Sequence, residues 1–348
     1  MKIADILPLP PHRRKSEGMD RIRVGFIGCG GNASGHIGRI HEMKDAEVVA
    51  LCDPSADSLD RARTRNDGLP ADIPTFDNHK DLLANVELDA VEISTPHTLH
   101  FEQITDALDC GLHVLSEKPM VCTVEHAHKV IAHAQDAGKI LMVSYQRHLQ
   151  PVYRYLRNQI ACGEMGEIQF ITAMQDQGWY RGTMGLWRQK LSLSGGGQLN
   201  DSGSHLLDIV LWMTGLAVDE VQAYVENFES EVDINSALSL RFKGGALGNI
   251  SVIGNAPSGG MWEDITIYGS KAAAYIRNGH LTYKAAGSDA AEPANLPGAM
   301  SPDRNFIDAI RGRDEVQVPP ICGLRVIELT EAAWESARTG QPAKVTTC

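Results

Sequence analysis

Short apolar runs separated by longer mixed stretches characterise the first part of the chain. Runs rich in aliphatic and β-branched residues predict strands, and a helix is expected in each interval between them. The expected strands are Arg23–Gly28, Glu47–Cys52, Thr75–Phe76, Ala90–Ser94, His113–Ser116 and Ile140–Ser144. The expected helices lie near Asn32–Met43, Ser55–Asn66, His79–Ala84, Leu99–Cys110 and Val124–Ala137. This alternation predicts an α/β fold with a doubly wound parallel sheet and right-handed crossovers over roughly the first 145 residues.

The pattern changes in the second part of the chain. A helix near Pro151–Cys162 precedes a strand at Glu167–Asp176 and an apolar helix at Asn200–Met213. Several strand-like runs then follow one another, separated by glycine turns, which predicts antiparallel pairing. These expected strands are Glu220–Phe228, Asn235–Phe242, Leu247–Gly254, Trp262–Tyr268, Ala273–Arg277 and Leu281–Lys284. Two helices, near Pro302–Arg311 and Cys322–Arg338, complete an α+β domain.

The first expected strand stops at a glycine turn that opens the first expected helix, in the stretch IRVGFIGCGGNASGHIGR. Gly28, Gly30 and Ala33 have the spacing of a dinucleotide-binding fingerprint, and Gly31 and Asn32 belong to the same turn. One glycine makes the tight turn, the next lets a pyrophosphate approach the backbone, and the helix N-terminus offers free N–H groups to the phosphates. The sequence therefore predicts a Rossmann-type nucleotide-binding domain.

An aspartate ends the second expected strand. Asp53 lies about 25 residues after Gly28, close to the roughly 20-residue offset of the acid that binds the adenosine ribose hydroxyls. A carboxylate there repels the extra phosphate of NADP, so we expect NAD in preference to NADP. Arg61 on the following helix is the residue that would offset this repulsion. The alternative interpretation of Asp53 is an exposed loop residue after a buried strand.

Bulk composition limits the classes of function. The 348 residues suffice for two domains, and we expect a flexible tail at 1–20, a nucleotide-binding domain at 21–145 and a substrate domain at 146–348. A net charge of −12 disfavours nucleic acids and anionic membrane surfaces as partners. Seven scattered cysteines without C-x-x-C indicate unpaired thiols in a reducing compartment, here the cytoplasm. We expect neither a signal peptide nor a membrane span.

Several stretches further along the chain resemble one enzyme family. The segment VEISTPHTLHFEQITDALDCGLHVLSEKPM is similar to the Gfo/Idh/MocA oxidoreductases, named after glucose–fructose oxidoreductase and inositol dehydrogenase. Tyr145-Gln146-Arg147-His148 resembles the family's segment leading out of the first domain, and Trp187-Arg188 resembles its W-R element. SGGGQLNDSGSHLLDIVLWMTG resembles its glycine turn and the helix that carries a D-x-x-x-H pair. These matches follow one another in order through most of the chain.

The resemblance implies a site and an assembly. In that family a T-P-x-x-x-H segment lines the cofactor, an E-K-P motif supplies a catalytic lysine, and a large, mostly antiparallel open sheet packs against other subunits. It therefore implies a homodimer or homotetramer and a sugar or cyclitol substrate. The catalytic residues that it implies are Lys118, Asp201 and His205. The cofactor-binding residues that it adds are Thr95, Pro96, His97, His100, Glu117, Lys118, Gln146, Trp187 and Arg188.

Asp201 and His205 have a spacing that suits acid–base chemistry. Four residues apart on the expected helix, they would share one face, and a histidine with a pKa of about 6.5 suits proton transfer at neutral pH. Lys118 would place a cation on the substrate oxygen and stabilise a developing alkoxide. Glu117 would orient Lys118 or bind the nicotinamide ribose. The glycines at 195–197 would let a ligand approach closely.

Structural roles remain open for the same residues. His205 could be a core histidine and Asp201 a helix cap. Together with Asp208 they could form part of a metal site, although we expect no metal because the family's chemistry uses none. His97 and His100 could be structural histidines of a loop and a helix start.

The resulting prediction is an NAD-dependent dehydrogenase acting on CH–OH groups. It would move a hydride between nicotinamide and a hydroxyl or keto carbon of a sugar, sugar acid or cyclitol. One alternative is an enzyme that retains NAD and cleaves glycosides by transient sugar oxidation, since its first step is identical. Others are a non-catalytic NAD-binding sensor and a scaffold. The presence of Lys118, Asp201 and His205 together argues against a sensor.

Overall fold

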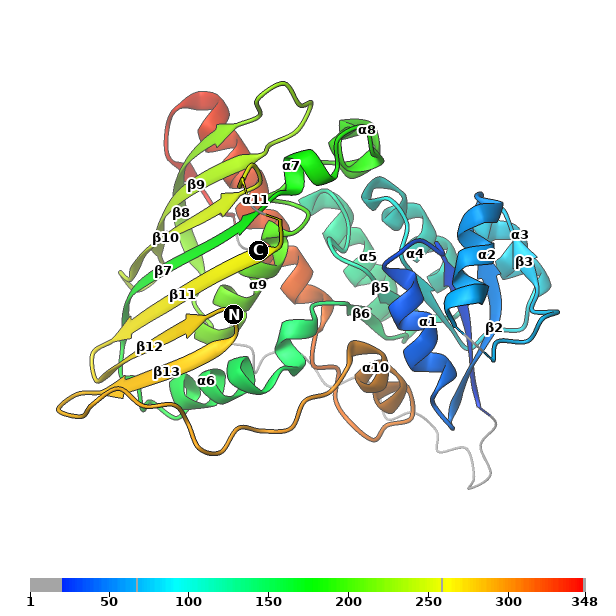
Figure 1. Ribbon diagram of the computed structural model, residues 1–348, viewed down its shortest axis with the longest axis horizontal. Coiled ribbons are helices and arrows are strands. Elements are labelled where there is room, and N and C mark those ends of the chain that lie inside the picture. Colours follow the sequence, from blue (N-terminus) through cyan, green and yellow to red (C-terminus); the bar gives the residue numbers. More distant parts are fainter. Residues whose placement is uncertain (1–20, 67, 258, 347–348) are drawn as a thin grey trace. The chain divides into compact units, whose positions relative to one another are not determined.

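The computed structural model describes residues 21–66, 68–257 and 259–346, which form two compact units (Figure 1). The first unit combines the described residues up to Val121 with Glu125–Ser144 and Met300–Ile321. The second combines Cys122–Val124, Tyr145–Ala299 and the chain from Cys322 onward. This division differs from the continuous one expected at residue 145, chiefly because 300–321 joins the first unit. Within the described ranges, no helix has both the length and the apolar character needed to cross a membrane.

A six-stranded parallel sheet forms the centre of the first unit, as expected. Its strands are β1 (Ile22–Ile27), β2 (Ala46–Cys52), β3 (Thr75–Phe76), β4 (Ala90–Ile93), β5 (His113–Ser116) and β6 (Leu141–Val143). Their spatial order is β3-β2-β1-β4-β5-β6 (Figure 1). The helices of this unit are α1 (Ala33–His41), α2 (Ala56–Arg65), α3 (His79–Asn85), α4 (His100–Asp109), α5 (Val124–Ala137) and α10 (Pro302–Ile310). The predicted doubly wound fold is confirmed.

The central strands of this sheet are buried on both faces. Every residue of β4 and of β5 is buried. Side chains on both faces of a central parallel strand lie under the covering helices, so such strands have nearly continuous apolar sequences. Glu92 in β4 is an exception to the apolar sequence, because it carries a carboxyl group and is only 1% exposed.

Helix α10 returns the chain to the first unit, where it packs against α1 and β5. Arg304 donates hydrogen bonds to both carboxylate oxygens of Asp45, at 2.9 and 3.0 Å, and Arg313 donates to Asp45 at 2.6 Å. The hydrogen bonds from Arg304, and to a smaller extent the one from Arg313, hold the pKa of Asp45 well below its usual value. These ion pairs tie the helix to the turn before β2, which explains why this late segment belongs to the first unit.

An eight-stranded mixed sheet dominates the second unit. Its strands are β7 (Ile168–Gln177), β8 (Val218–Glu226), β9 (Asn235–Phe242), β10 (Leu247–Ile253), β11 (Met261–Gly269), β12 (Ala272–Arg277), β13 (His280–Ala285) and β14 (Ala343–Lys344). They lie in the order β13-β12-β11-β7-β10-β9-β8-β14 (Figure 1). β7 and β10 pair in parallel, and the other neighbours pair antiparallel. The prediction of a large, mostly antiparallel sheet is confirmed, and β14 was not expected.

Helix α9 (Gly203–Thr214) is the buried helix of the second unit, and it packs against α6 and β7. Burial on nearly all sides explains why its sequence lacks a polar face. The other helices are α6 (Pro151–Ala161), the short α7 (Trp179–Gly182) and α8 (Leu191–Ser194), and α11 (Pro320–Thr339). The expected helix start at Asn200 is wrong, because a turn closed by the hydrogen bond from Asp201 N–H to Gly197 O, at 2.9 Å, precedes the helix. Asp201 therefore lies outside α9.

Candidate active site

The first glycine turn lies at the carboxyl end of β1. Gly28 has a φ of 91°, and a Cβ there would lie 2.6 Å from the carbonyl group of Ser94, so only glycine fits. At Gly30 and Gly31 a Cβ would meet nothing within 4 Å, so the space beside them is open. Asn32, the N-cap of α1, makes no capping hydrogen bond through its side chain to any described residue. This is a helix N-terminus of the kind that binds anions.

Asp53 lies at the carboxyl end of β2 and holds the glycine turn. The Cys29 N–H donates to one carboxylate oxygen of Asp53 at 2.8 Å, and the Ser55 N–H donates to the other at 2.8 Å. The carboxylate remains partly exposed. Ala33, the small residue of the fingerprint, begins α1 and is fully buried. The sequence predicted this acid at the strand end, and the structure adds its contact with the turn.

Thr95 and Pro96 follow β4, ahead of two buried histidines. His97 is 2% exposed, and His100, the first residue of α4, is completely buried. The two ring nitrogens of His100 lie 2.8 Å from the Pro119 carbonyl oxygen and 3.0 Å from the Thr95 carbonyl oxygen. Burial lowers the pKa of His100, although the two carbonyl oxygens favour the protonated ring. His100 thus joins the T-P-x-x-x-H segment to the E-K-P segment.

The E-K-P segment follows β5. Lys118 is half-buried, and its backbone N–H donates to one carboxylate oxygen of Glu117 at 3.1 Å. The other oxygen of Glu117 lies 3.1 Å from Nε2 of His36, which belongs to α1. The peptide bond between Lys118 and Pro119 is cis. The contact with His36 was not predicted from the sequence.

The carboxyl edge of the first sheet therefore gathers four predicted features. The glycine turn follows β1, Asp53 follows β2, Thr95 follows β4 and Lys118 follows β5. These four strands are neighbours, and the chain order reverses at β1, which is where open α/β sheets bind ligands. The open glycine turn suits a pyrophosphate and the carboxylate suits ribose hydroxyls, so these residues fit NAD.

In the second unit, Asp201 is held by two donors. Trp179 Nε1 and Arg188 Nε donate to the same oxygen of Asp201, at 2.8 and 3.0 Å, and Asp201 is 3% exposed. The guanidinium of Arg188 lies over the ring of Trp187, 4.5 Å from its centroid. The predicted W-R element thus contacts the predicted aspartate, a relation that the separate motifs did not show.

His205 lies in the first turn of α9 and is half-buried. The fully buried ring of Tyr145 meets the His205 ring edge-on, with centroids 5.7 Å apart. Gln146, the next residue in the chain, is exposed. His205 and Asp201 therefore lie on the first turn of α9 and on the turn that precedes it, rather than on one helix.

Asp208, which the sequence analysis grouped with Asp201 and His205, belongs to a different cluster. Its carboxylate lies 2.7 Å from Nε2 of His148, and both side chains are buried. With Cys322 they form a group whose potential ligand atoms lie within 4.8 Å of one another. A second such group, in the first unit, consists of His79, Glu102 and Asp106. In the part of the chain that the structure describes, Asp201, His205 and Asp208 form no such group.

A second glycine turn precedes Asp201. A Cβ on Gly196 would lie 2.4 Å from the Trp334 ring, and one on Gly197 would lie 1.9 Å from the Asp233 carbonyl oxygen. At both positions, therefore, the chain's own atoms occupy the place that a side chain would take, and this accounts for the two glycines without a ligand. Asp233 in turn accepts hydrogen bonds from the Gly197 N–H, the Leu199 N–H and Trp334 Nε1, at 2.9, 2.7 and 3.0 Å.

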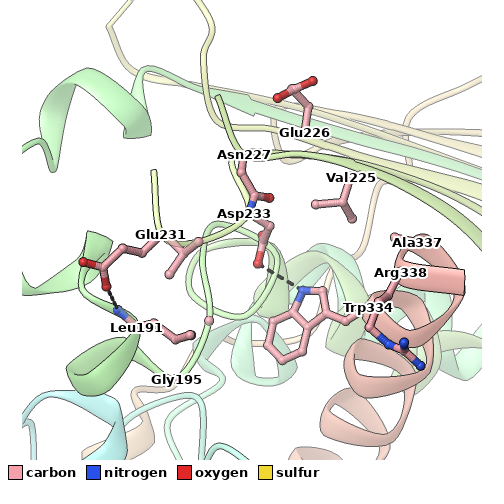
Figure 2. Close-up of a pocket in the computed structure, with 12 residues that line it drawn as sticks. Leu191, Gly195, Val225, Glu226, Asn227, Glu231, Asp233, Trp334, Ala337 and Arg338 are labelled. Carbon is pink, nitrogen blue, oxygen red and sulfur yellow. Dashed lines mark hydrogen bonds between the residues drawn. The ribbon is translucent and has the colours of Figure 1, made fainter. Parts of the chain in front are cut away.

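A cavity of about 510 Å³ lies beside this turn. Figure 2 shows Trp334 and Asp233 joined by their hydrogen bond at its wall, with Gly195 nearby. The charged side chains at its edge have partners in the same unit, since Glu231 accepts from the Leu191 N–H and Arg338 pairs with Glu335. Gly195 and Gly196 of the turn are among the residues that line this cavity.

Two family models match this chain. The model described as an oxidoreductase family with an NAD-binding Rossmann fold, GFO_IDH_MocA, matches residues 22–145. The model of the GFO/IDH/MocA C-terminal domain matches residues 153–275. The first match confirms the prediction of an NAD-binding Rossmann domain.

Named relatives and solved structures agree with these matches. The rhizopine catabolism protein MocA of Rhizobium meliloti is 30% identical over 57% of this chain and 58% of its own length. The D-glucoside 3-dehydrogenase of Escherichia coli K12 is 32% identical over 58% of this chain and 57% of its own. The chain thus spans less than three fifths of the length of these curated relatives.

Among solved structures, the WlbA dehydrogenase of Bordetella pertussis, crystallised with NADH and UDP-GlcNAcA, superposes with a TM-score of 0.82. It is 27% identical and covers 94% of this chain and 100% of its own. The sheet topology, the motifs at the strand ends and both family models all indicate the same family. This chain belongs to the Gfo/Idh/MocA family of oxidoreductases.

Proposed function

We propose that this protein is an NAD-dependent oxidoreductase acting on a hydroxyl or keto carbon of a sugar, sugar acid or cyclitol. The observation that carries the proposal is the carboxyl edge of the first sheet, where an open glycine turn, an acid suited to ribose and a lysine follow neighbouring strands. The name D-glucoside 3-dehydrogenase of one relative, and the UDP-GlcNAcA bound in the WlbA structure, support a carbohydrate substrate.

The proposed roles follow from the chemistry of three side chains. In the oxidation direction, His205 takes the proton of the substrate hydroxyl. Lys118 binds the hydroxyl oxygen and offsets its developing negative charge. Asp201, held by Trp179 and Arg188, tunes His205. When bound, NAD would supply the acceptor for the hydride of the carbon. The substrate thus loses its hydroxyl proton to His205 and a hydride to the cofactor, and a carbonyl group remains.

The proposed cofactor is NAD rather than NADP. Asp53 offers a partly exposed carboxylate at the end of β2, and Arg61, the cation that would favour NADP, donates a hydrogen bond to Ser58 Oγ at 3.2 Å. Gly30 and Gly31 leave room for the pyrophosphate. The further residues that we propose to line the cofactor are Asn32, Ala33, Thr95, Pro96, His97, Glu117, Gln146, Trp187 and Arg188. We propose that His100 supports this lining indirectly, because its ring contacts backbone carbonyl groups of both loops.

Two alanine variants test these roles. Lys118→Ala removes the cation and His205→Ala the base, and general acid–base groups contribute typically 10²–10⁴-fold. We expect steep losses of turnover in both and unchanged NAD affinity, measured by quenching of protein fluorescence. The His205 variant should also lose the pH dependence near neutrality. Asp201→Asn, the matched conservative change, should be milder. Near-normal turnover in His205→Ala with an unchanged pH profile would show that the assigned mechanism is wrong.

The runner-up function is NAD-retaining cleavage of glycosides by transient sugar oxidation. It uses the same first step, so the same residues serve it. The two functions differ in stoichiometry, because a dehydrogenase consumes one NAD for each product molecule and the glycoside-cleaving enzyme consumes none. Measuring NADH and product together with glycosides and free sugars as substrates separates them. Equal amounts of NADH and product would eliminate the runner-up. A non-catalytic sensor would bind NAD without producing either.

We further propose that the second sheet mediates homo-oligomer formation, as a dimer or tetramer. Phe170 on β7 is paired with Leu247 on β10 and with Tyr268 on β11, and the three side chains are 37%, 41% and 40% exposed. Cross-strand partners share a face of the sheet, so these residues form an apolar row. The strands that carry it, β10, β7 and β11, are neighbours in the sheet (Figure 1). Light scattering should give a mass above that of one chain, and Phe170→Glu should lower it. A monomeric wild-type protein would contradict this.

The proposed compartment is the cytoplasm. Six cysteines within the described ranges are unpaired: Cys29, Cys52, Cys110, Cys122, Cys162 and Cys322. Free thiols persist in reducing compartments, whereas secreted proteins of this kind tend to pair them. Cell fractionation followed by immunoblotting would test this, and recovery outside the cytoplasmic fraction would contradict it.

A further inference from the structure

A buried cluster of charged side chains lies against the E-K-P segment, entirely within the first unit. At its centre is His36 on α1, which is 4% exposed. Its Nδ1 lies 2.6 Å from a carboxylate oxygen of Asp303, on α10, and its Nε2 lies 3.1 Å from a carboxylate oxygen of Glu117. Asp303 and Glu117 are themselves buried. One imidazole thus joins three segments that are far apart in the sequence.

The two partners of His36 determine its protonation state. An ionised carboxylate accepts hydrogen bonds and donates none, so both ring nitrogens must carry protons. Burial alone would lower the pKa of His36, but the negative charges of Glu92 and Asp303 and the hydrogen bonds to Asp303 and Glu117 raise the pKa well above 6.5. Burial likewise acts to raise the pKa of Asp303, and the bonds from His36 and the charges of His36 and Arg39 lower it below 3.8. His36 is therefore an imidazolium at neutral pH.

The charges of the cluster balance in this state. Arg39, also on α1, donates to the second oxygen of Asp303. Glu92, on β4, also acts on His36 through its charge, and burial raises the pKa of this carboxyl to about 8. Apart from Glu92, the charges are two cations, His36 and Arg39, and two anions, Asp303 and Glu117. Without the imidazolium, two buried carboxylates would share one guanidinium, which is unfavourable.

We propose that His36 is a positioning residue for Lys118, an inference that rests on the proposed function of Lys118. The imidazolium holds one oxygen of Glu117, and the other oxygen of Glu117 accepts the backbone N–H of Lys118 at 3.1 Å. Asp303 fixes the imidazole from its opposite edge. Both Glu117 oxygens are engaged in this way, which favours the orienting role of Glu117 over binding of the nicotinamide ribose.

A spectroscopic measurement tests the contact without any substrate. In the full chain labelled with ¹⁵N-histidine, His36 should show two protonated ring nitrogens at pH 7, and its signals should be absent from the His36→Asn variant. Glu117→Gln removes one negative partner, so His36 should lose its second proton at lower pH than in the wild type, while Lys118→Ala should leave that pH unchanged. A neutral His36 ring at pH 7, or no change in Glu117→Gln, would overturn the inference.

Two substitutions of His36 separate positioning from folding. The amide nitrogen of Asn occupies roughly the place of Nδ1 and that of Gln roughly the place of Nε2. His36→Gln therefore keeps a donor for Glu117, and His36→Asn keeps one for Asp303. With NAD and methyl D-glucoside, D-glucose and myo-inositol as probes, we expect kcat to fall about tenfold or more in His36→Asn and less than about threefold in His36→Gln. KM and NAD affinity should remain unchanged in both.

Arg39→Gln serves as the matched control. It removes a donor to Asp303 but leaves Glu117 untouched, so it should lower the melting temperature and leave kcat unchanged. Equal losses of kcat in the two His36 variants, in step with their melting temperatures, would overturn the positioning role. Lys118→Ala distinguishes this failure from failure of the proposed function, because full turnover in that variant would remove the role of Lys118 while the ¹⁵N signals of His36 stayed as described. If none of the probes is oxidised, the ¹⁵N experiment decides alone.

Discussion

Each unit contains a glycine turn whose backbone is held by an aspartate, and the two turns differ in what surrounds them. In the first, Asp53 accepts the Cys29 N–H, its carboxylate stays partly exposed, and Gly30 faces open space. In the second, Asp233 accepts the Gly197 N–H together with two other donors, and it is buried, with 4% of its surface exposed. The first turn leaves space at Gly30, whereas in the second, called the filled turn below, atoms of the same unit occupy the place of a side chain at Gly196 and Gly197.

Glycine is required in these turns for two different reasons. Gly28 and Gly197 are required by the chain itself, because a Cβ on either would overlap with backbone atoms. Gly30 and Gly31 have no such neighbour within 4 Å, so their lack of a side chain is free to serve a ligand. Sequence spacing alone does not separate the two cases. Substitutions at these positions do, because one kind should affect stability and the other affinity.

The largest expected effect is at the filled turn. Gly197→Ala would place a methyl group 1.9 Å from the Asp233 carbonyl oxygen, a contact that only movement of the backbone can relieve. Overpacking typically costs about 1–3 kcal/mol, and a contact with immobile backbone belongs at or above the upper end, about 3 kcal/mol or more. Urea unfolding measures the loss, and Gly31→Ala, with open space at its Cβ, is the control. A loss below about 1 kcal/mol for Gly197→Ala would contradict the close packing described.

The same contrast shows what could be predicted from the sequence. Strands and helices of both units follow from periodicity and turn residues, because these depend on neighbours in sequence. The start of α9 at Gly203 could not be predicted in this way, because a turn closed by the Gly197 carbonyl precedes the helix. Contacts such as that between His36 and Asp303 join residues on α1 and α10, and no local pattern encodes them. The motif residues could be identified from the sequence, whereas the residues that contact them and hold them in place could not.

A smaller loss is expected from the aspartate of the filled turn. Asp233→Asn keeps the shape but offers one oxygen where the carboxylate offers two, so one of the three donors loses its acceptor. An unsatisfied buried donor costs about 1–3 kcal/mol. Trp334→Phe, which removes a single donor to the same carboxylate, is the matched comparison and should cost less. Denaturant unfolding at pH 7 measures both, and an unchanged midpoint in Asp233→Asn would contradict the arrangement.

The pH dependence of stability provides an independent measure of the same group. Burial raises the pKa of Asp233 above 3.8 in the folded state, even though its hydrogen bonds lower it. The folded protein therefore retains this proton at pH values where the unfolded chain has released it. Stability from this group must fall as the pH rises from about 3.8 through the folded pKa, and then level off. In Asp233→Asn this part of the slope should disappear, which unfolding curves over that pH range would show.

At the open turn, the effect should appear in affinity and not in stability. Gly30→Ala adds a methyl group where nothing lies within 4 Å, so the melting temperature should stay within a degree or two or rise slightly. The methyl group would occupy space that the proposed pyrophosphate needs, so NAD should bind about tenfold more weakly, equal to about 1.4 kcal/mol. Fluorescence titration with NAD measures this, and unchanged affinity would place the pyrophosphate elsewhere.

The smallest expected effect concerns the aspartate of the open turn. Asp53→Asn preserves both the shape of the side chain and an acceptor for the Cys29 N–H, so the turn should keep its conformation. What it removes is a negative charge that is partly exposed, and such charges interact by about 0.2–1 kcal/mol. The affinity ratio of NAD to NADP should therefore fall by up to about fivefold. Parallel titrations of the wild type and of Asp53→Asn with both cofactors measure the ratio. Asp57→Asn, which removes an exposed charge on the first turn of α2, should leave it unchanged. An equal shift in the two variants would mean that the cofactor senses only the net charge of this edge and that Asp53 has no specific part in selecting NAD.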